Sequence, residues 1–462
     1  MMSGRKFGEI SRRVAKARGL PPATRDRIAR EVNDHLEDAR QEYESIGHSH
    51  RKAVRLAARD FGDVRKTRTD LGRAWRGRRT VLFPETPGEG KASFWIYDAR
   101  LLAVILAVVL LLRWQVVAAY HIPTKSMEPT LHGHEIEGDR ILVNKLYFRF
   151  YAPDRWQIAV FADDRENRNL IKRVVGLPGE ILTIENGDLY ADGEILRKPP
   201  EVEADLLVPV FLEDRDVTAQ VRGYESSGLD SWEAVGEWTE TESGFFAVPD
   251  EEGKACLAWN DEIRNDVPGD RAGSQVVGDL VLSFVVTPDR GAETVGAVLR
   301  EGIDEFQVLF PVGEGETVLR RNREVVASAP GVHLVEQRPA AIRFANVDDL
   351  VSVRLDGVEV LRFEVPSAST ADDADDSRPP AEFGVRGMRS SALFSHVALS
   401  RDIHYLTGHE DRYRIPDDHY FMMGDNSGNS EDSRSKGSVS SSRLIGRPLM
   451  VIWPLKRVKV VR

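Results

Sequence analysis

The chain has 462 residues, a net charge of -11 and 41% hydrophobic residues, so its length predicts two to four domains with real cores. Its single cysteine, Cys256, excludes an intramolecular disulfide framework. Asp and Glu outnumber Lys and Arg by more than two to one across residues 201–400, which argues against nucleic-acid binding there.

The first 80 residues are predicted to form a cytoplasmic helical domain. The extreme N-terminus is charged and lacks a continuous apolar core, so no cleavable export signal is expected there. Two segments place apolar residues on one helix face at three- and four-residue steps: Ile28, Val32, Leu36, Ala39 and Tyr43, then Val54, Ala57 and Phe61. The stretch "DHLEDAR…AVRLAARDFGD" resembles a small helical domain that precedes membrane segments in some bacterial permeases.

A linker rich in Pro and Gly, residues 81–93, precedes the chain's one membrane candidate, residues 94–120. The strictly apolar centre, Leu101 to Leu112, is shorter than the ~20 residues of a usual spanning helix, but flanking aromatic, Ala and Val residues extend it. A buried core helix is the alternative. Seven Lys and Arg residues between Arg65 and Arg79 predict a cytoplasmic N-terminal side, so everything after Tyr120 is expected outside.

Beyond the membrane candidate, alternating apolar and polar residues around Gly, Pro and Asn-Gly turns predict a β domain, 121–200 and 403–462. Residues 201–402 interrupt it with strand candidates of similar length, which suggest an inserted β-sandwich cap. Its later segments resemble concanavalin-like or laminin-G-like sandwiches. The acidic stretch 368–381 is interpreted as a solvated loop rather than a calcium site, because its acids do not follow the spacing of an EF-hand.

Four separated stretches together resemble type I signal peptidases, the membrane-bound Ser/Lys endopeptidases that remove export signals. They are "IPTKSMEPTL" (122–131), "GDRILVNKLYF" (138–148), "IKRVVGLPGE" (171–180) and "GDNSGNSEDSR" (424–434). Their order and their position just beyond a membrane candidate carry the resemblance. It covers roughly residues 95–200 and 410–462. Together with the patterns above, it predicts a multidomain chain: an N-terminal α-helical domain, one transmembrane helix, and a mainly-β catalytic domain that the sandwich interrupts.

Ser126 is the predicted nucleophile and Lys172 the predicted general base. A serine hydroxyl needs a base that accepts its proton, and a lysine can do so only when burial lowers its pKa. Leu170, Ile171, Val174 and Val175 could bury Lys172.

Other bases near Ser126 are less suitable on sequence grounds. Lys125 should point to the opposite face in an extended backbone, and Lys145 is expected in a strand with a solvated role. His121, His132 and His134 cluster near Ser126 without an obvious carboxylate to orient them, so a Ser-His pair stays as the alternative.

The resemblance implies further roles. Thr124 and the Ser126 N–H would stabilise the oxyanion, Ser430 would orient the lysine, and Asp432 and Arg434 would form a structural ion pair. The sequence departs from the family where Ser427 follows "GDN" in place of an arginine. It departs again where Ser435, Lys436 and Gly437 follow "DSR" in place of an aromatic-Gly pair. Both departures concern the packing beneath the site.

We therefore expect signal peptidase I activity on exported preproteins at the bacterial cytoplasmic membrane, with a single-pass anchor in lipid and without cofactor or metal. Small residues at the first and third positions before the cut are implied for the substrate. One alternative is a specialised peptidase of the same chemistry that processes a few surface proteins. Another is a membrane-tethered binding protein with a vestigial peptidase core, whose sandwich binds an envelope protein or a glycan.

Overall fold

The computed structural model describes residues 2–17, 20–78, 101–106, 108–109, 116–163, 167–213, 229–266, 273–366 and 378–461. These fall into two units, 1–110 and 111–462. The predicted linker, residues 94–100 and 110–115 of the predicted membrane segment, and residues 368–377 of the acidic stretch lie outside the described residues. No helix within the described ranges is long and apolar enough to cross a membrane. The predicted division of the chain into domains stays a prediction.

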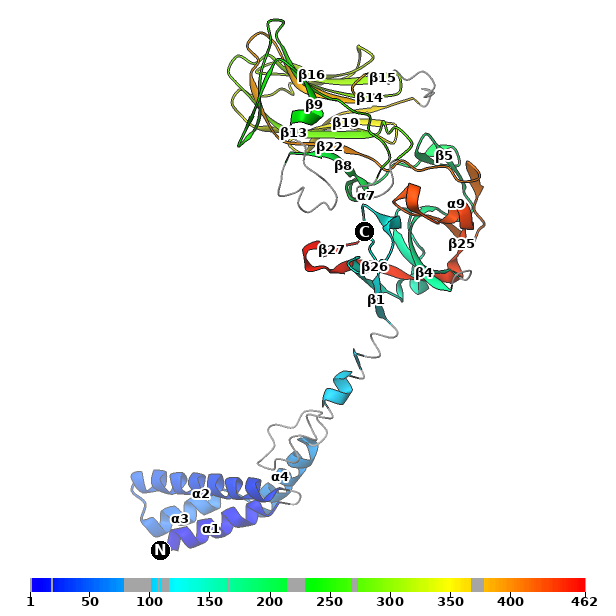
Figure 1. The fold of residues 1–462 in the computed structure, drawn as a ribbon. Coiled ribbons are helices and arrows are strands. Elements are labelled where there is room, and N and C mark those ends of the chain that lie inside the picture. Colours follow the sequence, from blue (N-terminus) through cyan, green and yellow to red (C-terminus); the bar gives the residue numbers. More distant parts are fainter. Residues whose placement is uncertain are drawn as a thin grey trace. The chain divides into compact units, whose positions relative to one another are not determined.

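The N-terminal unit is helical. It contains α1 (Met2–Ala15), α2 (Pro22–Ser45), α3 (His50–Asp60) and α4 (Val64–Arg78), coloured blue in Figure 1. The helices α1, α2 and α3 share a small core around Leu36, Val54 and Ala57, to which α1 adds Phe7. The predicted apolar faces are therefore largely confirmed, although Ile28 lies outside this core. Helix α2 ends just before Gly47, whose φ of 92° suits glycine.

The second unit begins with an antiparallel sheet that carries the candidate site. Its strand order is β1-β2-β26-β3-β4-β24-β25, with β27 paired to β26. The strands are β1 (Val117–His121), β2 (Arg140–Asn144), β3 (Ile158–Asp163), β4 (Arg168–Gly176), β24 (His419–Met423), β25 (Val439–Ser440), β26 (Leu444–Trp453) and β27 (Lys459–Val460). The sheet therefore joins residues from both sides of the insertion, because β24 pairs with β4 and β26 lies between β2 and β3.

A smaller sheet, β23-β5-β6-β7, packs beside the first. Its strands are β5 (Ile181–Glu185), β6 (Asp188–Ala191), β7 (Glu194–Ile195) and β23 (Arg412–Arg414). The short helix α7 (Pro200–Leu206) follows, and its Leu206 is buried in the same core as Leu182 of β5 and Phe421 of β24. The chain returns to this core at Ile403 and Tyr405 after the insertion.

The described residues between 208 and 401 form two sheets that stack face to face around one large core (Figure 1). One sheet contains β8 (Val208–Leu212), β10 (Glu237–Thr241), β11 (Gly244–Val248), β13 (Leu280–Pro288), β18 (Ala340–Val347), β19 (Leu350–Leu355), β20 (Val358–Glu364) and β22 (Ala392–Arg401). The other contains β9 (Trp232–Val235), β12 (Lys254–Trp259), β14 (Thr294–Glu301), β15 (Asp304–Pro311), β16 (Glu316–Arg321), β17 (Glu324–Pro330) and β21 (Ala381–Arg386). This is the inserted β-sandwich that strand rhythm predicts.

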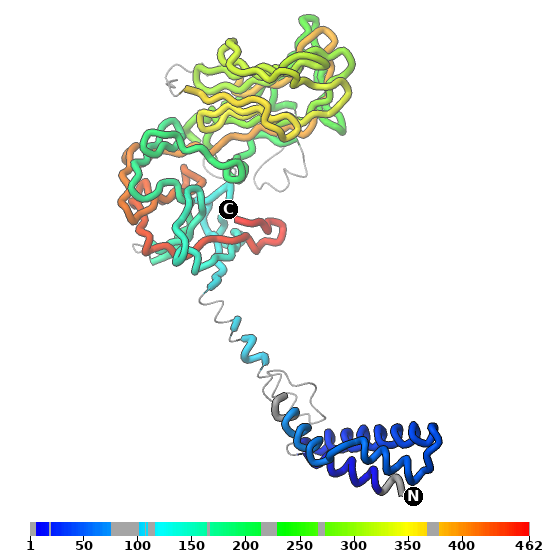
Figure 2. Tube along the Cα trace, turned by 180° about the vertical axis from the view of Figure 1, so that it is seen from behind, coloured from blue at the N-terminus to red at the C-terminus, as the bar shows by residue number. Residues whose placement is uncertain are grey.

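The two ends of the sandwich lie side by side. Strand β8 at its start pairs antiparallel with β22 at its end, and the two run together in green and orange in Figure 2. A domain with neighbouring termini can be inserted into a host sheet without breaking the host's hydrogen-bond ladder. This explains how β4 and β24 remain adjacent although the sandwich separates them in sequence.

Candidate active site

Ser126 lies in a tight turn a few residues after the edge strand β1. The turn is the single-turn 3₁₀ helix η1 (Lys125–Met127), and the Ser126 side chain is only 7% exposed. Two glycines let the surrounding backbone close on this turn. A Cβ at Gly133 would lie 1.7 Å from the Thr124 carbonyl oxygen, and one at Gly424 would lie 2.4 Å from the Ser126 carbonyl oxygen. The glycine in "GDN" is therefore needed for this close approach.

Lys172 reaches Ser126 from the middle of β4. Its Nζ donates a hydrogen bond of 2.6 Å to Ser126 Oγ, and the residue is 3% exposed. Side chains two apart in a strand share a face, so Leu170 and Val174 lie on the side of Lys172 while Ile171 and Val175 point away. The predicted apolar wall is thus half correct.

Burial lowers the pKa of Lys172 from 10.5 to about 8, because the charged ammonium loses its hydration. The carboxylates of Asp432 and Asp425 oppose this shift, whereas Arg168 and Lys436 add to it. At a pKa of about 8 a substantial fraction of the amine is neutral near pH 8. It can then accept the proton of the serine hydroxyl with which it is already hydrogen-bonded.

Thr124 lies beside the serine hydroxyl. Its Oγ1 is 3.3 Å from Ser126 Oγ, and its backbone is extended before η1 begins. The Thr124 hydroxyl and the Ser126 backbone N–H therefore belong to the same turn as the nucleophile. Two donors must lie close together if both are to donate hydrogen bonds to the same oxyanion.

The neighbouring lysines and histidines have other environments. Lys125 is on η1, so the sequence argument from an extended backbone was wrong in its premise. Successive side chains of a 3₁₀ helix are about 120° apart, which still separates Lys125 from Ser126. Lys145 follows β2 rather than lying within it. His132 has a carboxylate partner that the sequence did not reveal, Glu128, with Nδ1 and Oε1 2.9 Å apart.

Asp432 and Arg434 form the expected ion pair beneath the site. Arg434 Nε and Nη2 donate to the two carboxylate oxygens of Asp432 at 2.9 and 2.8 Å. The same carboxylate accepts the Gly424 N–H at 3.1 Å, and the Asn426 N–H donates to the Ser126 carbonyl at 3.2 Å. The pair therefore fixes the turn that supports the serine backbone.

Ser427 is part of this network, which gives the first departure from the family pattern a structural role. Arg434 Nη1 donates to Ser427 Oγ at 2.8 Å, and the Leu406 N–H donates to the same oxygen at 2.8 Å. A small hydroxyl thus joins the ion pair to the segment that returns from the sandwich. In the second departure, Lys436 ends the short helix α9 (Ser433–Lys436) and contacts Asp163 of β3 at 2.8 Å.

Ser430 is near the site but does not orient Lys172 in this structure. Its Oγ is buried and makes no hydrogen bond to any described residue. A Cβ added to Gly424 would lie 2.2 Å from this hydroxyl oxygen, so Ser430 packs directly against Gly424. The hydrogen bond expected from the resemblance is therefore not formed here, and the role of Ser430 stays a prediction.

A buried ion pair next to Lys172 was missed in the sequence. Arg173 Nε and Nη2 donate to Asp425 Oδ1 and Oδ2, each at 2.8 Å, and both residues are almost fully buried. Arg173 also donates to the Trp156 carbonyl at 2.6 Å and to Thr130 Oγ1 at 3.2 Å. A charged residue in the apolar run "IKRVVG" was the available signal, since such a residue needs a partner when buried.

Comparison with known proteins gives the following. The family described as "Signal peptidase, peptidase S26" matches residues 95–237 and 355–453. The probable signal peptidase I-2 of Synechocystis sp. is 31% identical over 125 residues, which cover 26% of this chain and 54% of that protein. A signal peptidase I of Bacillus amyloliquefaciens is 39% identical over 101 residues, 22% of this chain and 50% of that protein. The chain spans about half the length of the curated relatives it matches.

Among solved structures, the carbohydrate-binding module CBM66 from Bacillus subtilis is similar, at 15% identity and a TM-score of 0.24. The match covers 36% of this chain and 93% of that one. At this TM-score the likeness carries no argument about what the sandwich binds.

Proposed function

This chain belongs to the signal peptidase family, peptidase S26, and we propose that it is a signal peptidase I. In this proposal it is a serine endopeptidase that cleaves N-terminal signal peptides from exported preproteins at the membrane surface. The observation that carries the proposal is the 2.6 Å hydrogen bond between Lys172 Nζ and Ser126 Oγ in a water-poor setting. A buried lysine with a lowered pKa beside a serine hydroxyl is an arrangement for nucleophilic catalysis.

In the first step, neutral Lys172 accepts the Ser126 proton as Oγ attacks the scissile carbonyl carbon. A tetrahedral intermediate forms, and its oxyanion accepts hydrogen bonds from the Ser126 N–H and the Thr124 hydroxyl. The Lys172 ammonium then gives its proton to the leaving amine, and the C–N bond breaks to leave an ester on Ser126. Water attacks this ester with Lys172 again as base, which releases the acid and restores the serine.

The supporting residues act through these two. Asp432 and Arg434 hold the turn at Gly424, which keeps the Ser126 carbonyl in place. Ser430 would accept a hydrogen bond from the Lys172 ammonium once it forms, because its buried Oγ has no other partner among the described residues. Such positioning residues set the geometry of the nucleophile and its base, to which catalytic rates are sensitive.

The proposed location is the bacterial cytoplasmic membrane, with one pass through lipid at residues 94–120 and a cytoplasmic N-terminus. The apolar run Leu101 to Leu112 and the basic segment Arg65 to Arg79 support this. A signal peptide is itself an apolar segment held in the bilayer. An anchored enzyme whose nucleophile follows the anchor by few residues would meet the scissile bond at the membrane surface.

The sandwich gives a specific reason to retain a second activity, binding of a glycan or an envelope protein. A shallow, open depression of about 30 Å³ lies on the sheet that contains β12, β14, β15 and β21. It is lined by apolar residues and by four polar side chains that can donate or accept hydrogen bonds: Lys254, Gln307, Glu382 and Arg386. Sites for small ligands commonly combine a concave surface with a few such groups. Under this proposal the sandwich selects substrates or positions the enzyme in the envelope.

The test of the peptidase proposal is cleavage of a panel of preproteins by the purified full-length protein, with N-terminal sequencing of the products. The expected result is one new N-terminus per preprotein, after small residues at the first and third positions before the cut. The Ser126→Ala variant should give none. Ser442→Ala, which changes an exposed serine outside the site, is the matched control and should cleave normally. Equal cleavage by Ser126→Ala would refute the proposal.

A further inference from the structure

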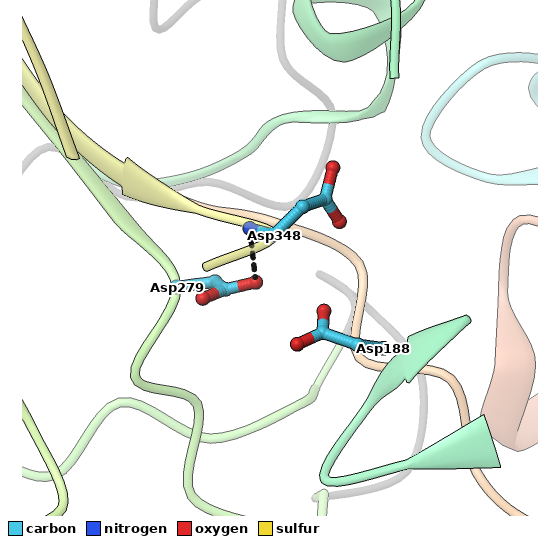
Figure 3. A group of neighbouring side chains, drawn as sticks. All are labelled: Asp188, Asp279 and Asp348. Carbon is cyan, nitrogen blue, oxygen red and sulfur yellow. Dashed lines mark hydrogen bonds between the residues drawn. The ribbon is translucent and has the colours of Figure 1, made fainter. Parts of the chain in front are cut away.

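Three carboxylates from distant parts of the sequence meet where the sandwich joins the peptidase part. Asp188 begins β6, Asp279 immediately precedes β13, and Asp348 follows β18. Each offers one oxygen, and the three oxygens lie within 4.8 Å of one another. Figure 3 shows the side chains of Asp188 and Asp279 pointing toward each other from the two parts of the chain.

Lys198 pairs with one member of this group, Asp348, and with one carboxylate outside it, Asp402. Its Nζ pairs with Asp348 Oδ1 and, at 2.7 Å, with Asp402 Oδ2. One ammonium is thus shared between two acids. Asp188 and Asp279 therefore bring two further negative charges to the same place.

Asp279 supplies an independent sign of a missing ligand. Its residue is only 9% exposed, and its Oδ2 accepts the Asp348 N–H at 3.2 Å. Its other oxygen, Oδ1, is buried without a hydrogen-bond partner among the described residues. A buried carboxylate oxygen that lacks any partner is costly, so native structures usually give it a donor, a water or an ion.

The neighbouring groups increase this cost. Asp188 and Glu301 bring further carboxylates to the surroundings of Asp279. Asn346 donates from Nδ2 to Glu301 at 2.7 Å, while its own Oδ1 is buried without a partner among the described residues. Both Asp348 oxygens accept from Lys198, but Asp279 Oδ1 and Asn346 Oδ1 lack a donor among the described residues, which suits a bound cation.

We propose that Asp188, Asp279 and Asp348 bind a hard divalent cation of the calcium class at the junction of the peptidase part and the sandwich. Calcium takes six to eight oxygen ligands at about 2.3–2.6 Å, so oxygens on opposite sides of it are about 5 Å apart. Carboxylates within 4.8 Å of one another can therefore share one ion with little movement. Water and backbone carbonyls would complete the shell.

The site has a structural consequence because its ligands come from both parts. Asp188 belongs to the small sheet of the peptidase part, whereas Asp279 and Asp348 belong to the sandwich. The ion would bind only when the two are docked, and by linkage it would stabilise the docked arrangement. Calcium would then fix the sandwich relative to Ser126 without taking part in the chemistry.

The test is isothermal titration of calcium chloride into the purified full-length chain after EDTA treatment and its removal, together with thermal unfolding with and without calcium. We expect one site and a raised midpoint. Free calcium at 100 times the Kd should shift the unfolding equilibrium of the coupled region about 100-fold. Asp279→Asn and Asp188→Asn should each weaken binding at least tenfold. Asp356→Asn is the control, since Asp356 is an exposed turn residue of the same sheet.

The stability in EDTA separates a metal ligand from a merely structural aspartate. Without calcium, Asp279→Asn should be at least as stable as the parent, because it removes one of several crowded negative charges. With calcium it should be the less stable protein. Absence of calcium binding by the parent, a response to magnesium alone, or unchanged calcium affinity in both Asp279→Asn and Asp188→Asn would overturn the proposal. Retained affinity in both variants would place any bound ion elsewhere. Failure of both asparagine variants to fold would also count against it, since a carboxylate needed only for its metal should tolerate an amide.

Discussion

The pH dependence of cleavage follows from the burial of Lys172. With a pKa of about 8, the base is about one-tenth neutral at pH 7, half neutral at pH 8 and nine-tenths neutral at pH 9. An exposed lysine with a pKa of 10.5 would be less than ~1% neutral at pH 8, so burial raises the active fraction about 150-fold there. We expect kcat/KM to rise tenfold per pH unit below pH 7 and to level off above about pH 9.

The assay is kcat/KM for a short signal-peptide substrate between pH 5.5 and 10. The Arg168→Gln variant tests the direction in which a neighbouring charge shifts the pKa of Lys172. Arg168 lowers the pKa of Lys172, so its loss should move the midpoint upward by a few tenths of a unit. Arg149→Gln, which removes an exposed arginine from a different segment, is the control.

Two results would refute this reasoning. A midpoint near 10.5 would mean that Lys172 is not desolvated in the working enzyme. A midpoint near 6.5 would point to an imidazole. If the rise in kcat/KM around that pH then disappeared on replacement of His121, His132 or His134, the Ser-His alternative would be correct.

Three further predictions concern the oxyanion, the buried ion pair and the sandwich. Thr124→Val should lower kcat about 10²- to 10³-fold, whereas Thr124→Ser should keep most of the parental kcat. An unchanged kcat in Thr124→Val would show that the Thr124 hydroxyl does not stabilise the oxyanion. Arg173→Leu should lower the free energy of unfolding, measured with denaturant, by about 3–5 kcal/mol, because it leaves Asp425 buried and unpaired. Loss of the exposed Arg168 should lower it by less than about 1 kcal/mol. Similar losses in the two variants would contradict the assignment of Arg173 and Asp425 as a buried ion pair. Replacement of residues 208–400 by a Gly/Ser linker should leave a protein that is folded by circular dichroism and cleaves a short peptide, with altered selection among full-length preproteins. A folded but inactive product would make the sandwich part of the catalytic apparatus.

The structure changes where that excision should begin. A deletion of the whole predicted insertion, residues 201–402, would remove Leu206, although this residue is fully buried in the core of the peptidase part. A cut after residue 207 keeps it. Ending the deletion at residue 400 also keeps Asp402, which pairs with Lys198. The boundary could not be seen in the sequence because Leu206 and Val208 are both apolar, although Leu206 packs in the peptidase core and Val208 begins the first sandwich strand.

Strands with regular alternation were predictable from the sequence. β15 and β22 alternate between buried and half-buried residues along most of their length, which is the period-2 pattern of a strand with one covered face. The strands β8 to β12 were not predicted individually, because each has only 4 to 6 residues. Trp232 and Trp259 of this region nevertheless contribute to the sandwich core.

The candidate site was predictable where motifs are local and unpredictable where contacts are distant. Ser126 and Lys172 could be paired because each lies in a stretch with its own recognisable pattern. Arg173 and Asp425 are 252 residues apart, and no periodicity connects them. The same applies to Asp188, Asp279 and Asp348, which only the docking of the sandwich brings together. The turn at η1 was missed because three residues carry too little pattern to distinguish a 3₁₀ helix from an extended segment.

The central claim is that Lys172 is the base for Ser126, and turnover of one preprotein by four alanine variants tests it most directly. Ser126→Ala and Lys172→Ala should each lose cleavage to the background rate. Lys125→Ala and Lys145→Ala should keep most of it, although both lysines lie closer to Ser126 in the sequence. All four proteins should show the far-ultraviolet circular dichroism of the parent. Turnover at the parental rate by Lys172→Ala would contradict the account.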